Sequence, residues 1–474
     1  MDIANLTIRK AGEAMVRGDF TARELTDAYL AEIEKRNGEL NAYLYVFTEH
    51  ARVQADEVDK KRAGGEKLGP LAGIPLAIKD NILIEGEITS SASKILENYK
   101  ATYDATVIAR LRSAGAVFLG HTNMDEFAMG ASNENSAYGP VKNPLDTTRV
   151  PGGSSGGSAV AVAGNMALGA LGSDTGGSVR QPASFCGLVG MKPTYGAVSR
   201  YGLIAMASSL DQIGPLAKNV EDAQIIFDCI KGRDKMDSTS EEYPTNENVP
   251  KEITIGVPTD FPKEGLDSEV LKNFEQSVEK LKGLGYKIKE ISLPNIKYSV
   301  ACYYIIMPAE ISSNLARFDG VRYGLHVDGK NLLEDYKLSK AEGFGPETKR
   351  RIILGTYVLS AGYYDSYYGK ALAVQSLIRR DFDTAFNEVQ AIIMPTTPGP
   401  AFRFGEKSDN PVEMYLEDIF TISANLSGLP AVSVPSGLVE KEGSSLPLGL
   451  QIITPHFAEA MMFGIAERFR QGLL

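Results

Sequence analysis

Cysteine, histidine and long apolar runs are all scarce in this chain of 474 residues. The three cysteines, Cys186, Cys229 and Cys302, are odd in number and lack C-x-x-C spacing, which argues against a disulfide framework and against a zinc site. No run of about eighteen apolar residues could cross a bilayer, and the N-terminus has no basic segment followed by an apolar core. We therefore expect a cytoplasmic protein that does not contact membranes, with its cysteines used in packing.

Motifs for several kinds of chemistry are also absent. The sequence has no G-x-x-x-x-G-K-[ST] and no H-E-x-x-H, so it gives no support to nucleotide hydrolysis or zinc catalysis by this chain. Its formal net charge of −11 would repel a phosphate backbone, which disfavours a broad nucleic-acid-binding face. We expect no metal and no cofactor in the chain itself, and we expect a more basic partner to make most contacts with any RNA.

Helix and strand patterns alternate along the chain, as they do in α/β proteins. The capping-box pair Thr21 and Glu24 and the cap Asn219 predict helix starts, and short apolar runs such as AVFLG, ITIGV and AIIMP predict strands. We predict an α/β fold with a single large mixed β-sheet flanked by helices. The polar stretch 233–250 is a surface connection and the best candidate boundary. We divide the single domain 1–474 into a helical N-terminal part at 1–65, a core at about 66–230 and a C-terminal part at about 251–474 that completes the sheet.

Two glycine- and serine-rich turns, residues 152–158 and 174–178, flank the apolar segment 159–171. Glycine admits positive φ values and lets the backbone approach another group closely, so several N–H groups of such a turn can face one point. That arrangement suits an oxyanion that develops during a reaction. A flexible connector is the alternative, but connectors are polar along their length, whereas 159–171 has the composition of a buried helix and strand.

Two motif matches in these turns predict other chemistries. Residues 152–156 satisfy G-x-S-x-G, the nucleophile elbow of α/β-hydrolases, but Ser154 follows a polar, proline-broken stretch and not a buried strand. None of the four histidines lies in a turn that selects it as a base. Asp174-Thr175-Gly176 matches the D-T-G of aspartic proteases, which need two such carboxylates, and the chain has no second copy. Their context disfavours both hypotheses.

A lysine is another candidate base for a serine nucleophile. Lys79 ends the apolar run LAGIPLAIK, and burial there can make it neutral if the pKa falls from ~10.4 by roughly three units. A lysine that reaches solvent at a strand edge is the other interpretation. A base that cannot itself reach the nucleophile can act through an intervening hydroxyl. Because the chain has two serine turns, one can carry the nucleophile and the other this hydroxyl.

The runs that carry these residues, GIPLAIK, PGGSSGGS and SDTGGSVRQPA, together resemble the amidase signature family. Four further runs, TNMDEFAMG, SSNLARFDGVRYG, KRRIILGTY and SAGYYDSYY, are similar to the glutamine-hydrolysing branch of that family, which serves tRNA-dependent amidotransferases. The similarity extends over essentially the whole chain. It implies the amidase signature fold, which agrees with the single mixed sheet predicted above.

Carried onto this sequence, the resemblance makes Ser178 the nucleophile that is acylated, Ser154 the bridging hydroxyl and Lys79 the base. It also implies a cis peptide bond between Gly153 and Ser154. The oxyanion of the tetrahedral intermediate would be bound by four backbone N–H groups. These belong to Thr175, Gly176, Gly177 and Ser178.

The resemblance further implies that glutamine is the substrate. A site for this zwitterion needs a cation for the α-carboxylate and an anion for the α-amino group. Arg351 in KRRI and Asp418 before IFT would take these roles, and one of Tyr303 and Tyr304 would contact the substrate. The alternatives are that Arg351 belongs to a solvated basic run and that Asp418 caps a helix.

The implied reaction supplies ammonia for converting Glu-tRNA(Gln) to Gln-tRNA(Gln), with Asp-tRNA(Asn) as a second candidate substrate. A B subunit would bind the misacylated tRNA and use ATP and Mg²⁺, and a small C subunit would complete a heterotrimer. The acidity of this chain agrees with that division. Two alternatives stay open: a stand-alone amidase acting on small carboxamides, and a scaffold with a vestigial site.

Overall fold

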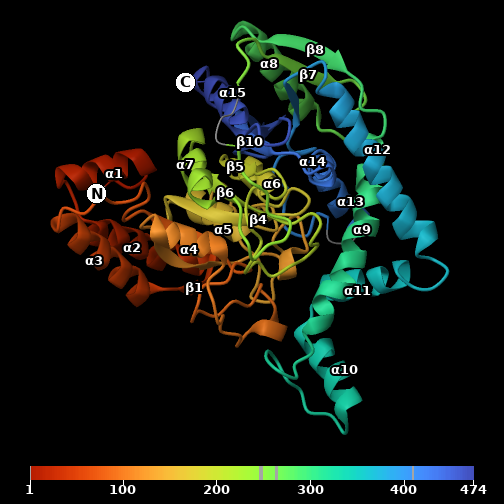
Figure 1. The fold of residues 1–474 in the computed structure, drawn as a ribbon, viewed down its shortest axis with the longest axis horizontal. Coiled ribbons are helices and arrows are strands. Elements are labelled where there is room, and N and C mark those ends of the chain that lie inside the picture. Colours follow the sequence, from red (N-terminus) through yellow and green to blue (C-terminus); the bar gives the residue numbers. More distant parts are fainter. Residues whose placement is uncertain (1, 245–248, 262–264, 408–409, 474) are drawn as a thin grey trace.

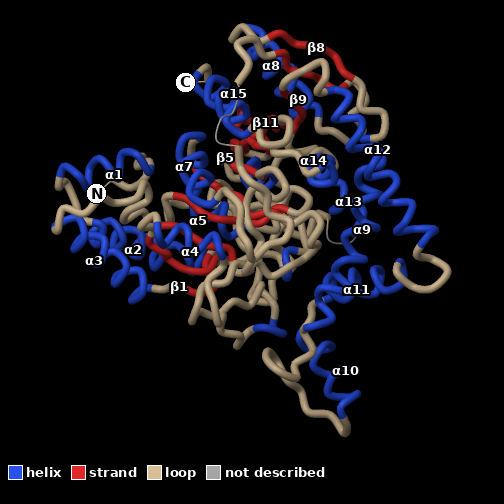
Figure 2. Tube along the Cα trace, viewed as in Figure 1, coloured by secondary structure: helices blue, strands red, loops and turns tan. Residues whose placement is uncertain are grey.

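One mixed sheet runs through the whole molecule. A computed structural model describes residues 2–244, 249–261, 265–407 and 410–473. Within these residues, eleven strands form one sheet in the order β1-β3-β2-β4-β6-β5-β10-β11-β9-β7-β8. The strands are β1 (Tyr43–Val46), β2 (Pro75–Lys79), β3 (Val117–Thr122), β4 (Gly169–Asp174), β5 (Val189–Lys192), β6 (Gln212–Ala217), β7 (Thr254–Pro258), β8 (Lys287–Ile291), β9 (Ala391–Pro395), β10 (Ala431–Lys441) and β11 (Ser444–Ile453). Helices flank the sheet (Figure 1 and Figure 2), so the predicted α/β fold is confirmed.

Parallel and antiparallel pairs both occur in this sheet. β2 pairs in parallel with β3 and β4, whereas β4 is antiparallel to β6. β10 lies antiparallel between β5 and β11 and so joins the strands of the two halves of the chain. Because β2 and β4 are parallel neighbours, their carboxyl ends meet at one edge of the sheet, where ligands of α/β proteins usually bind. β2 ends at Lys79 and β4 at Asp174.

The helices begin where the sequence predicts caps. Thr21 accepts a hydrogen bond from Glu24 N and Asn219 from Asp222 N, at the starts of two helices. The helices of the first half are α1 (Ile8–Arg17), α2 (Ala22–Leu40), α3 (Thr48–Ala63), α4 (Thr106–Ser113), α5 (Gly156–Ala163), α6 (Arg180–Phe185) and α7 (Val220–Ile230). Those of the second half are α8 (Ser268–Gly283), α9 (Ser299–Asn314), α10 (Leu332–Gly343), α11 (Pro346–Val358), α12 (Lys370–Ala385), α13 (Pro411–Tyr415), α14 (Ile422–Ser427) and α15 (Glu459–Gln471). None of the helices in the described ranges combines the length and apolar character needed to cross a membrane.

Helices cover both faces of the sheet at β4. A side chain at Gly169 would meet Ile226 of α7, whereas a side chain at Gly172 would meet Ser155 at the start of α5. Since odd and even residues of a strand face opposite sides, α7 and α5 lie on opposite faces. The two glycines therefore let both helical layers approach the strand that leads to the second serine turn.

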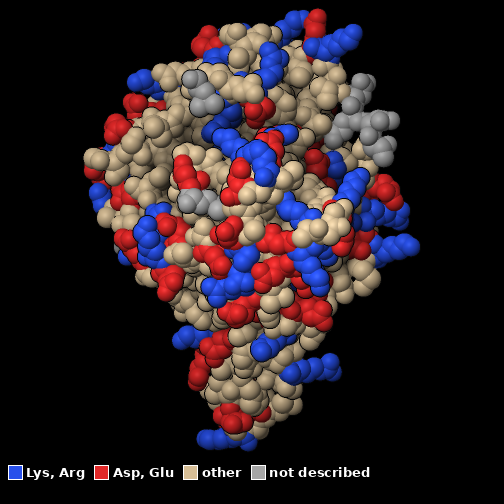
Figure 3. All heavy atoms as spheres, turned by 90° about the vertical axis from the view of Figure 1, so that its left-hand side faces the viewer, with Lys and Arg blue, Asp and Glu red and all other residues tan. Residues whose placement is uncertain are grey.

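The two sides of the molecule carry different helices (Figure 1). α1, α2 and α3 lie on the side of β1, and α9 to α12 lie on the opposite side, where α10 and α11 project from the body. The face on the side of α1 to α3 shows positive and negative side chains interspersed (Figure 3). On α2, for example, Arg23 pairs with Asp27 and with Asp56 of α3. This face is therefore electrically mixed, unlike the basic surfaces that bind nucleic acid.

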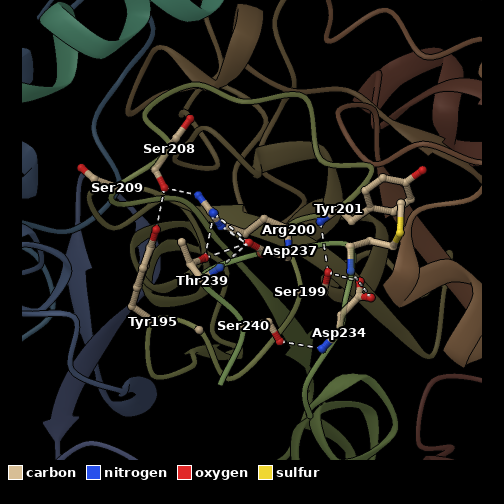
Figure 4. A network of polar contacts seen from close by, with 12 residues as sticks. Tyr195, Ser199, Arg200, Tyr201, Ser208, Ser209, Asp234, Asp237, Thr239 and Ser240 are labelled. Atoms are coloured by element: carbon tan, nitrogen blue, oxygen red, sulfur yellow. Dashed lines mark hydrogen bonds and ion pairs between the residues drawn. The ribbon is translucent and has the colours of Figure 1, made fainter. Parts of the chain in front are cut away.

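The first part of the polar stretch 233–250 is bonded to the body of the protein. Arg200 donates to both carboxylate oxygens of Asp237, at 3.2 and 2.9 Å, and to Thr239 at 2.7 Å (Figure 4). The Asp234 carboxylate accepts a hydrogen bond from Ser199 Oγ at 2.6 Å. Residues 233–241 thus form a surface connection, as expected, but paired charges hold them in place; residues 245–248 lie outside the described residues.

Candidate active site

Lys79 lies at the end of β2 and is fully buried, so it does not reach solvent at a strand edge. Its Nζ donates hydrogen bonds to Ser154 Oγ at 2.7 Å, Ser155 Oγ at 2.8 Å and Ser173 Oγ at 3.0 Å. Ser173 belongs to β4, beside β2, and the other two serines belong to the first glycine-serine turn. The sheet and the turn therefore surround one amine with three hydroxyl groups.

Burial decides the protonation of Lys79. It lowers the pKa of Lys79 to about 7, although Asp125, Asp174 and Asp211 oppose the shift. A charged amine loses its hydration on burial, and three nearby carboxylates return only part of that free energy. A large fraction of this amine is therefore neutral near pH 7, and a neutral amine has a lone pair that can accept a proton.

The two serine turns are buried and bonded to each other, which excludes the flexible connector. The Gly153–Ser154 peptide bond is cis, as the resemblance implies, and Gly153 N donates to Gln181 Oε1 at 2.8 Å. Ser155 N donates to the Ser178 carbonyl at 3.1 Å. In the described structure, the hydroxyls of Ser154 and Ser178 make no hydrogen bond to each other. Ser178 is 7% exposed and Ser154 is fully buried, so Ser178 is the serine of the two that a substrate can reach.

The second turn presents fewer free N–H groups than the resemblance implies. Gly177 N donates to Asp174 Oδ1 at 2.9 Å and is therefore engaged within the turn. Gly177 has φ +138°, and a side chain there would lie 2.3 Å from Thr421 Oγ1, so the position requires glycine for its conformation and for space. Three N–H groups of the turn have no acceptor among the described residues: those of Thr175, Gly176 and Ser178.

Asp174 anchors this turn from the end of β4. Besides Gly177 N, its carboxylate accepts hydrogen bonds from Val179 N at 3.2 Å and from Arg180 Nε at 3.0 Å. Burial disfavours the charge, but Arg180 and Asn425 outweigh burial and lower the pKa of Asp174 to about 2. The turn is thus built around a carboxylate that stays ionised at every pH of interest.

The four expected substrate-binding residues lie together: Tyr303, Tyr304, Arg351 and Asp418. The Arg351 guanidinium lies 5.5 Å from the ring centroids of Tyr304 and Tyr415, which stack on each other at 3.9 Å. Arg351 Nε also donates to Glu347 Oε1 at 2.7 Å. Arg351 is only 4% exposed, so it is not part of a solvated basic run.

Asp418 and Tyr303 complete this group. The Asp418 carboxylate accepts no hydrogen bond from any described residue, so it caps no described helix. Burial raises the pKa of Asp418 well above its usual range, with Arg351 opposing the shift. A side chain at Gly176 would lie 2.8 Å from the Tyr303 hydroxyl, so Tyr303 borders the second serine turn while Tyr304 borders Arg351. The group offers a cation and an unpaired carboxyl near the second serine turn, which Tyr303 borders at Gly176.

Groups of three or more histidine, cysteine, aspartate or glutamate side chains that could hold a metal ion do not occur among the described residues. The cysteines are free thiols, and Cys186 and Cys302 are buried. Their predicted role in packing is confirmed.

Several residues of the site were not predicted from the sequence. Ser155 and Ser173 both bond Lys79, and Asp211 accepts a hydrogen bond from Thr175 Oγ1 at 2.7 Å. The doubled serine in PGGSSGGS is a signal that could have pointed to Ser155. Ser173 and Asp211 have no such signal, because their roles depend on which strands and loops become neighbours.

Comparison with known proteins assigns the chain to a family. The Amidase family model matches residues 24–463. The chain is 54% identical to the A subunit of glutamyl-tRNA(Gln) amidotransferase from Koribacter versatilis, over 100% of this chain and 99% of the relative. It is 52% identical to the protein of the same name from Carboxydothermus hydrogenoformans, over 100% of this chain and 98% of the relative. The crystal structure of the Thermotoga maritima protein of that name is similar with a TM-score of 0.80 at 42% identity, covering 99% of this chain and 95% of that chain. The chain therefore belongs to the amidase family.

Proposed function

We propose that this chain is the glutamine-hydrolysing subunit of a tRNA-dependent amidotransferase. The observation that carries the proposal is the buried contact of 2.7 Å between Lys79 Nζ and Ser154 Oγ, beside a second serine that a substrate can reach. A largely neutral amine that contacts a hydroxyl group is the start of a proton relay. Lys79, Ser154 and Ser178 are the proposed catalytic residues.

The proposed reaction has two halves. Ser178 Oγ attacks the side-chain carboxamide carbon of glutamine and passes its proton to Ser154 Oγ, whose own proton moves to Lys79 Nζ. The relay then protonates the amide nitrogen, the C–N bond breaks and ammonia leaves, while the glutamyl group stays on Ser178 as an ester. A water molecule is deprotonated by the same relay, attacks the ester and releases glutamate.

The negative oxygen that forms in each half needs donors that are already in place. The N–H groups of Thr175, Gly176 and Ser178 are free for this role, whereas Gly177 N is engaged with Asp174. Donors fixed by the fold cost no reorganisation when the charge develops, which is why such groups lower the barrier. We therefore propose a three-donor oxyanion site, in which Gly177 shapes the turn.

Arg351 and Asp418 are the proposed partners of the two charged groups of glutamine. Arg351 would bind the α-carboxylate, and Asp418, whose carboxyl accepts no hydrogen bond from a described residue, would bind the α-ammonium. Tyr303 is the proposed tyrosine contact because its hydroxyl borders Gly176; Tyr304 supports Arg351 through its ring. A stand-alone amidase for simple carboxamides would not need Arg351 and Asp418, so these two residues favour glutamine over that alternative.

The ammonia would be used by a partner. We propose that a B subunit binds Glu-tRNA(Gln), activates its glutamate with ATP and Mg²⁺ and receives the ammonia, and that a C subunit joins the two in a cytoplasmic heterotrimer. The full-length similarity to A subunits of glutamyl-tRNA(Gln) amidotransferases from three organisms supports this assignment. Asp-tRNA(Asn) is a candidate second substrate of the same complex.

The test is amidation of Glu-tRNA(Gln) by the complex purified from its native source. With ATP present, we expect product from either glutamine or ammonium. The Ser178→Ala variant should lose the reaction with glutamine by at least about 10⁴-fold and keep the reaction with ammonium, because only the first needs the nucleophile. Glutamine-dependent product at the parental rate from Ser178→Ala would refute the assignment, and hydrolysis of simple aliphatic amides without any tRNA amidation would favour the stand-alone amidase.

A further inference from the structure

Two adjacent buried carboxylates, Asp125 and Glu126, lie between the serine turns and α11. They follow β3 in the run TNMDEFAMG, at the start of the helical turn η2 (Glu126–Ala128). Asp125 is fully buried and Glu126 is 2% exposed. The reaction proposed above uses neither of them, although burying two carboxylates side by side is costly unless each is well bonded.

Asp125 holds one loop against the first serine turn. Its carboxylate accepts hydrogen bonds from Asn133 N at 3.0 Å and Asn135 N at 3.1 Å. Its own backbone N donates to the Ser154 carbonyl at 3.3 Å. A side chain at Gly153 would lie 2.1 Å from Asp125 Oδ2, so the carboxylate packs directly on the peptide that presents Ser154. Asp125 therefore connects the loop 130–135 to the proposed bridging serine.

Glu126 holds the start of α11. Its carboxylate accepts hydrogen bonds from Gly345 N at 2.8 Å and from Thr348 Oγ1 at 2.6 Å, and a further one from Ser93 Oγ. α11 has no side-chain cap from its own N-cap residue, so Glu126 supplies a negative group to the positive end of this helix. Thr348 and Arg351 are three residues apart and thus lie on the same side of α11.

The loop and the helix line one hollow, together with Lys407 and with Pro411, Met414 and Tyr415 of α13. A cavity of about 160 Å³ is lined by Gly130, Ser132, Glu134 and Asn135 from the loop and by Glu347 and Arg351 from α11. Asp125 is hydrogen-bonded to the loop and Glu126 to the start of α11, and these two residues are joined by one peptide bond. A shift of η2 would therefore change the position of Arg351 relative to the serine turns.

We propose that Asp125 and Glu126 are positioning residues that set the distance between the Ser154–Ser178 turns and Arg351, and so match the site to the length of glutamine. This inference rests on the proposed function and names what selects the substrate of that site. Glutamine and asparagine carry the same charged groups and the same carboxamide, and differ by one methylene group. A rigid connection between the acylation site and the carboxylate-binding arginine can tell them apart, and a loosened connection cannot.

The first arm of the test measures how strongly the full complex discriminates between substrates of different length. Glu126→Ala should raise the KM for glutamine and lower kcat/KM by about 10- to 100-fold, with less effect on kcat. The ratio of kcat/KM for glutamine to that for asparagine should fall about tenfold, a change that a general loss of folded protein would not cause. Glu126→Gln, which keeps the volume and one acceptor oxygen, should shift both quantities less and in the same direction. Glu342→Ala, an exposed position on α10, is the matched control.

The second arm measures the reactivity of the Ser178 hydroxyl in the absence of glutamine. Phenylmethanesulfonyl fluoride forms a bond from Ser178 Oγ to sulfur, releases fluoride and passes the serine proton to the relay, and mass spectrometry gives the rate. Asp125, Asp174 and Asp211 are the carboxylates that favour the charged form of Lys79. Removing one of them in Asp125→Asn should move the midpoint of the rate-against-pH curve to lower pH, whereas a merely structural defect would lower its plateau. Glu126→Ala should leave this midpoint in place.

Unchanged KM and an unchanged glutamine-to-asparagine ratio in both Glu126 variants would overturn the role of Glu126. An unmoved midpoint in Asp125→Asn, or a glutamine-to-asparagine ratio that stays unchanged in this variant, would overturn the role of Asp125. If the wild-type complex hydrolyses no glutamine while Ser178 is still sulfonylated, the proposed function fails, and the Asp125 midpoint still decides whether this carboxylate positions the relay.

Discussion

Asp174 and Arg180, which lie before and after the proposed nucleophile Ser178 in the chain, form a fully buried ion pair through two hydrogen bonds, at 3.0 and 2.9 Å. The same Asp174 carboxylate accepts the N–H groups of Gly177 and Val179. Arg180 also donates to Asn425 Oδ1 at 2.6 Å, in the second half of the chain. Arg180 thus ties the nucleophile turn to α14, in the second half of the chain.

Removing Arg180 should be strongly destabilising. Arg180→Met would leave the Asp174 carboxylate buried without its counter-charge, and we expect the free energy of unfolding to fall by about 3–5 kcal/mol. The matched control is Arg17→Met, which removes an exposed pair with Asp19 whose side chains are 60% and 50% accessible, and should cost less than about 1 kcal/mol. Urea denaturation measures both. Equal effects of the two substitutions would contradict the structural role given to the buried pair.

The rate of glutamine hydrolysis should rise with pH through about 7. Lys79 acts only when it is neutral, burial lowers its pKa to about 7, and the neutral fraction grows above that pH. The plot of kcat/KM against pH should show this midpoint, and Lys79→Met should lower kcat/KM by about 10²- to 10⁴-fold. Lys192 is a matched control, because burial also lowers its pKa to about 7 and its Nζ donates to the Pro193 carbonyl. If the midpoint moved in Lys192→Met and stayed in place in Lys79→Met, Lys79 would not be the base.

Arg351 and Arg350 are neighbours with opposite environments. Arg351 is buried against Tyr304 and Tyr415, whereas the Arg350 side chain is 50% accessible. Arg351→Ala should raise the KM for glutamine roughly 100-fold, about 3 kcal/mol, because the α-carboxylate loses a buried cation. Arg350→Ala should change it by less than about threefold. Ammonium should still serve as nitrogen donor in both variants, and its failure in Arg351→Ala would show that the residue does not act on glutamine.

Glutamine affinity should increase with pH in the range where Asp418 titrates. Burial raises the pKa of Asp418 well above its usual range, so before glutamine binds this carboxyl keeps its proton to a higher pH than an exposed aspartate does. The α-ammonium of glutamine favours the ionised form, so binding releases a proton and becomes tighter as pH rises. Calorimetry in two buffers with different ionisation enthalpies measures this proton release. Asp418→Asn should bind glutamine more weakly and should release no proton on binding. Proton release that persists in Asp418→Asn would show that another group is the one that loses the proton.

Local signals in the sequence predicted many elements well. The caps Thr21 and Asn219 mark the starts of α2 and α7 to within one residue, because a cap and the N–H group it bonds are only three residues apart. The apolar segment 159–171 contains most of α5 and half of β4, although α5 begins at Gly156, within the first glycine-serine run, and β4 ends at Asp174, the first residue of the second. The apolar run already pointed to Lys79 and the two turns to their serines; the resemblance added the proposed roles, with Ser178 as the nucleophile and Ser154 as the bridging hydroxyl.

Contacts between distant segments could not be predicted in this way. The hydroxyl of Ser173 reaches Lys79 only because β4 lies beside β2, and neither strand carries a signal for its neighbour. The bond from Gly177 N to Asp174 depends on the exact conformation of one turn, so a motif cannot tell which of its N–H groups are free. The roles proposed for Asp125 and Glu126 depend on contacts with the first serine turn and with α11, whose positions the sequence pattern does not fix.

The parallel pairing of β2 with β4 has a consequence for how such proteins diversify. Because these two strands are neighbours, every group of the proposed proton relay comes from residues 79–178. The groups proposed to contact glutamine come from residues 303–418. A lineage can therefore change which charged groups its amide substrate carries through changes confined to the later segment, while the inherited reaction chemistry stays intact.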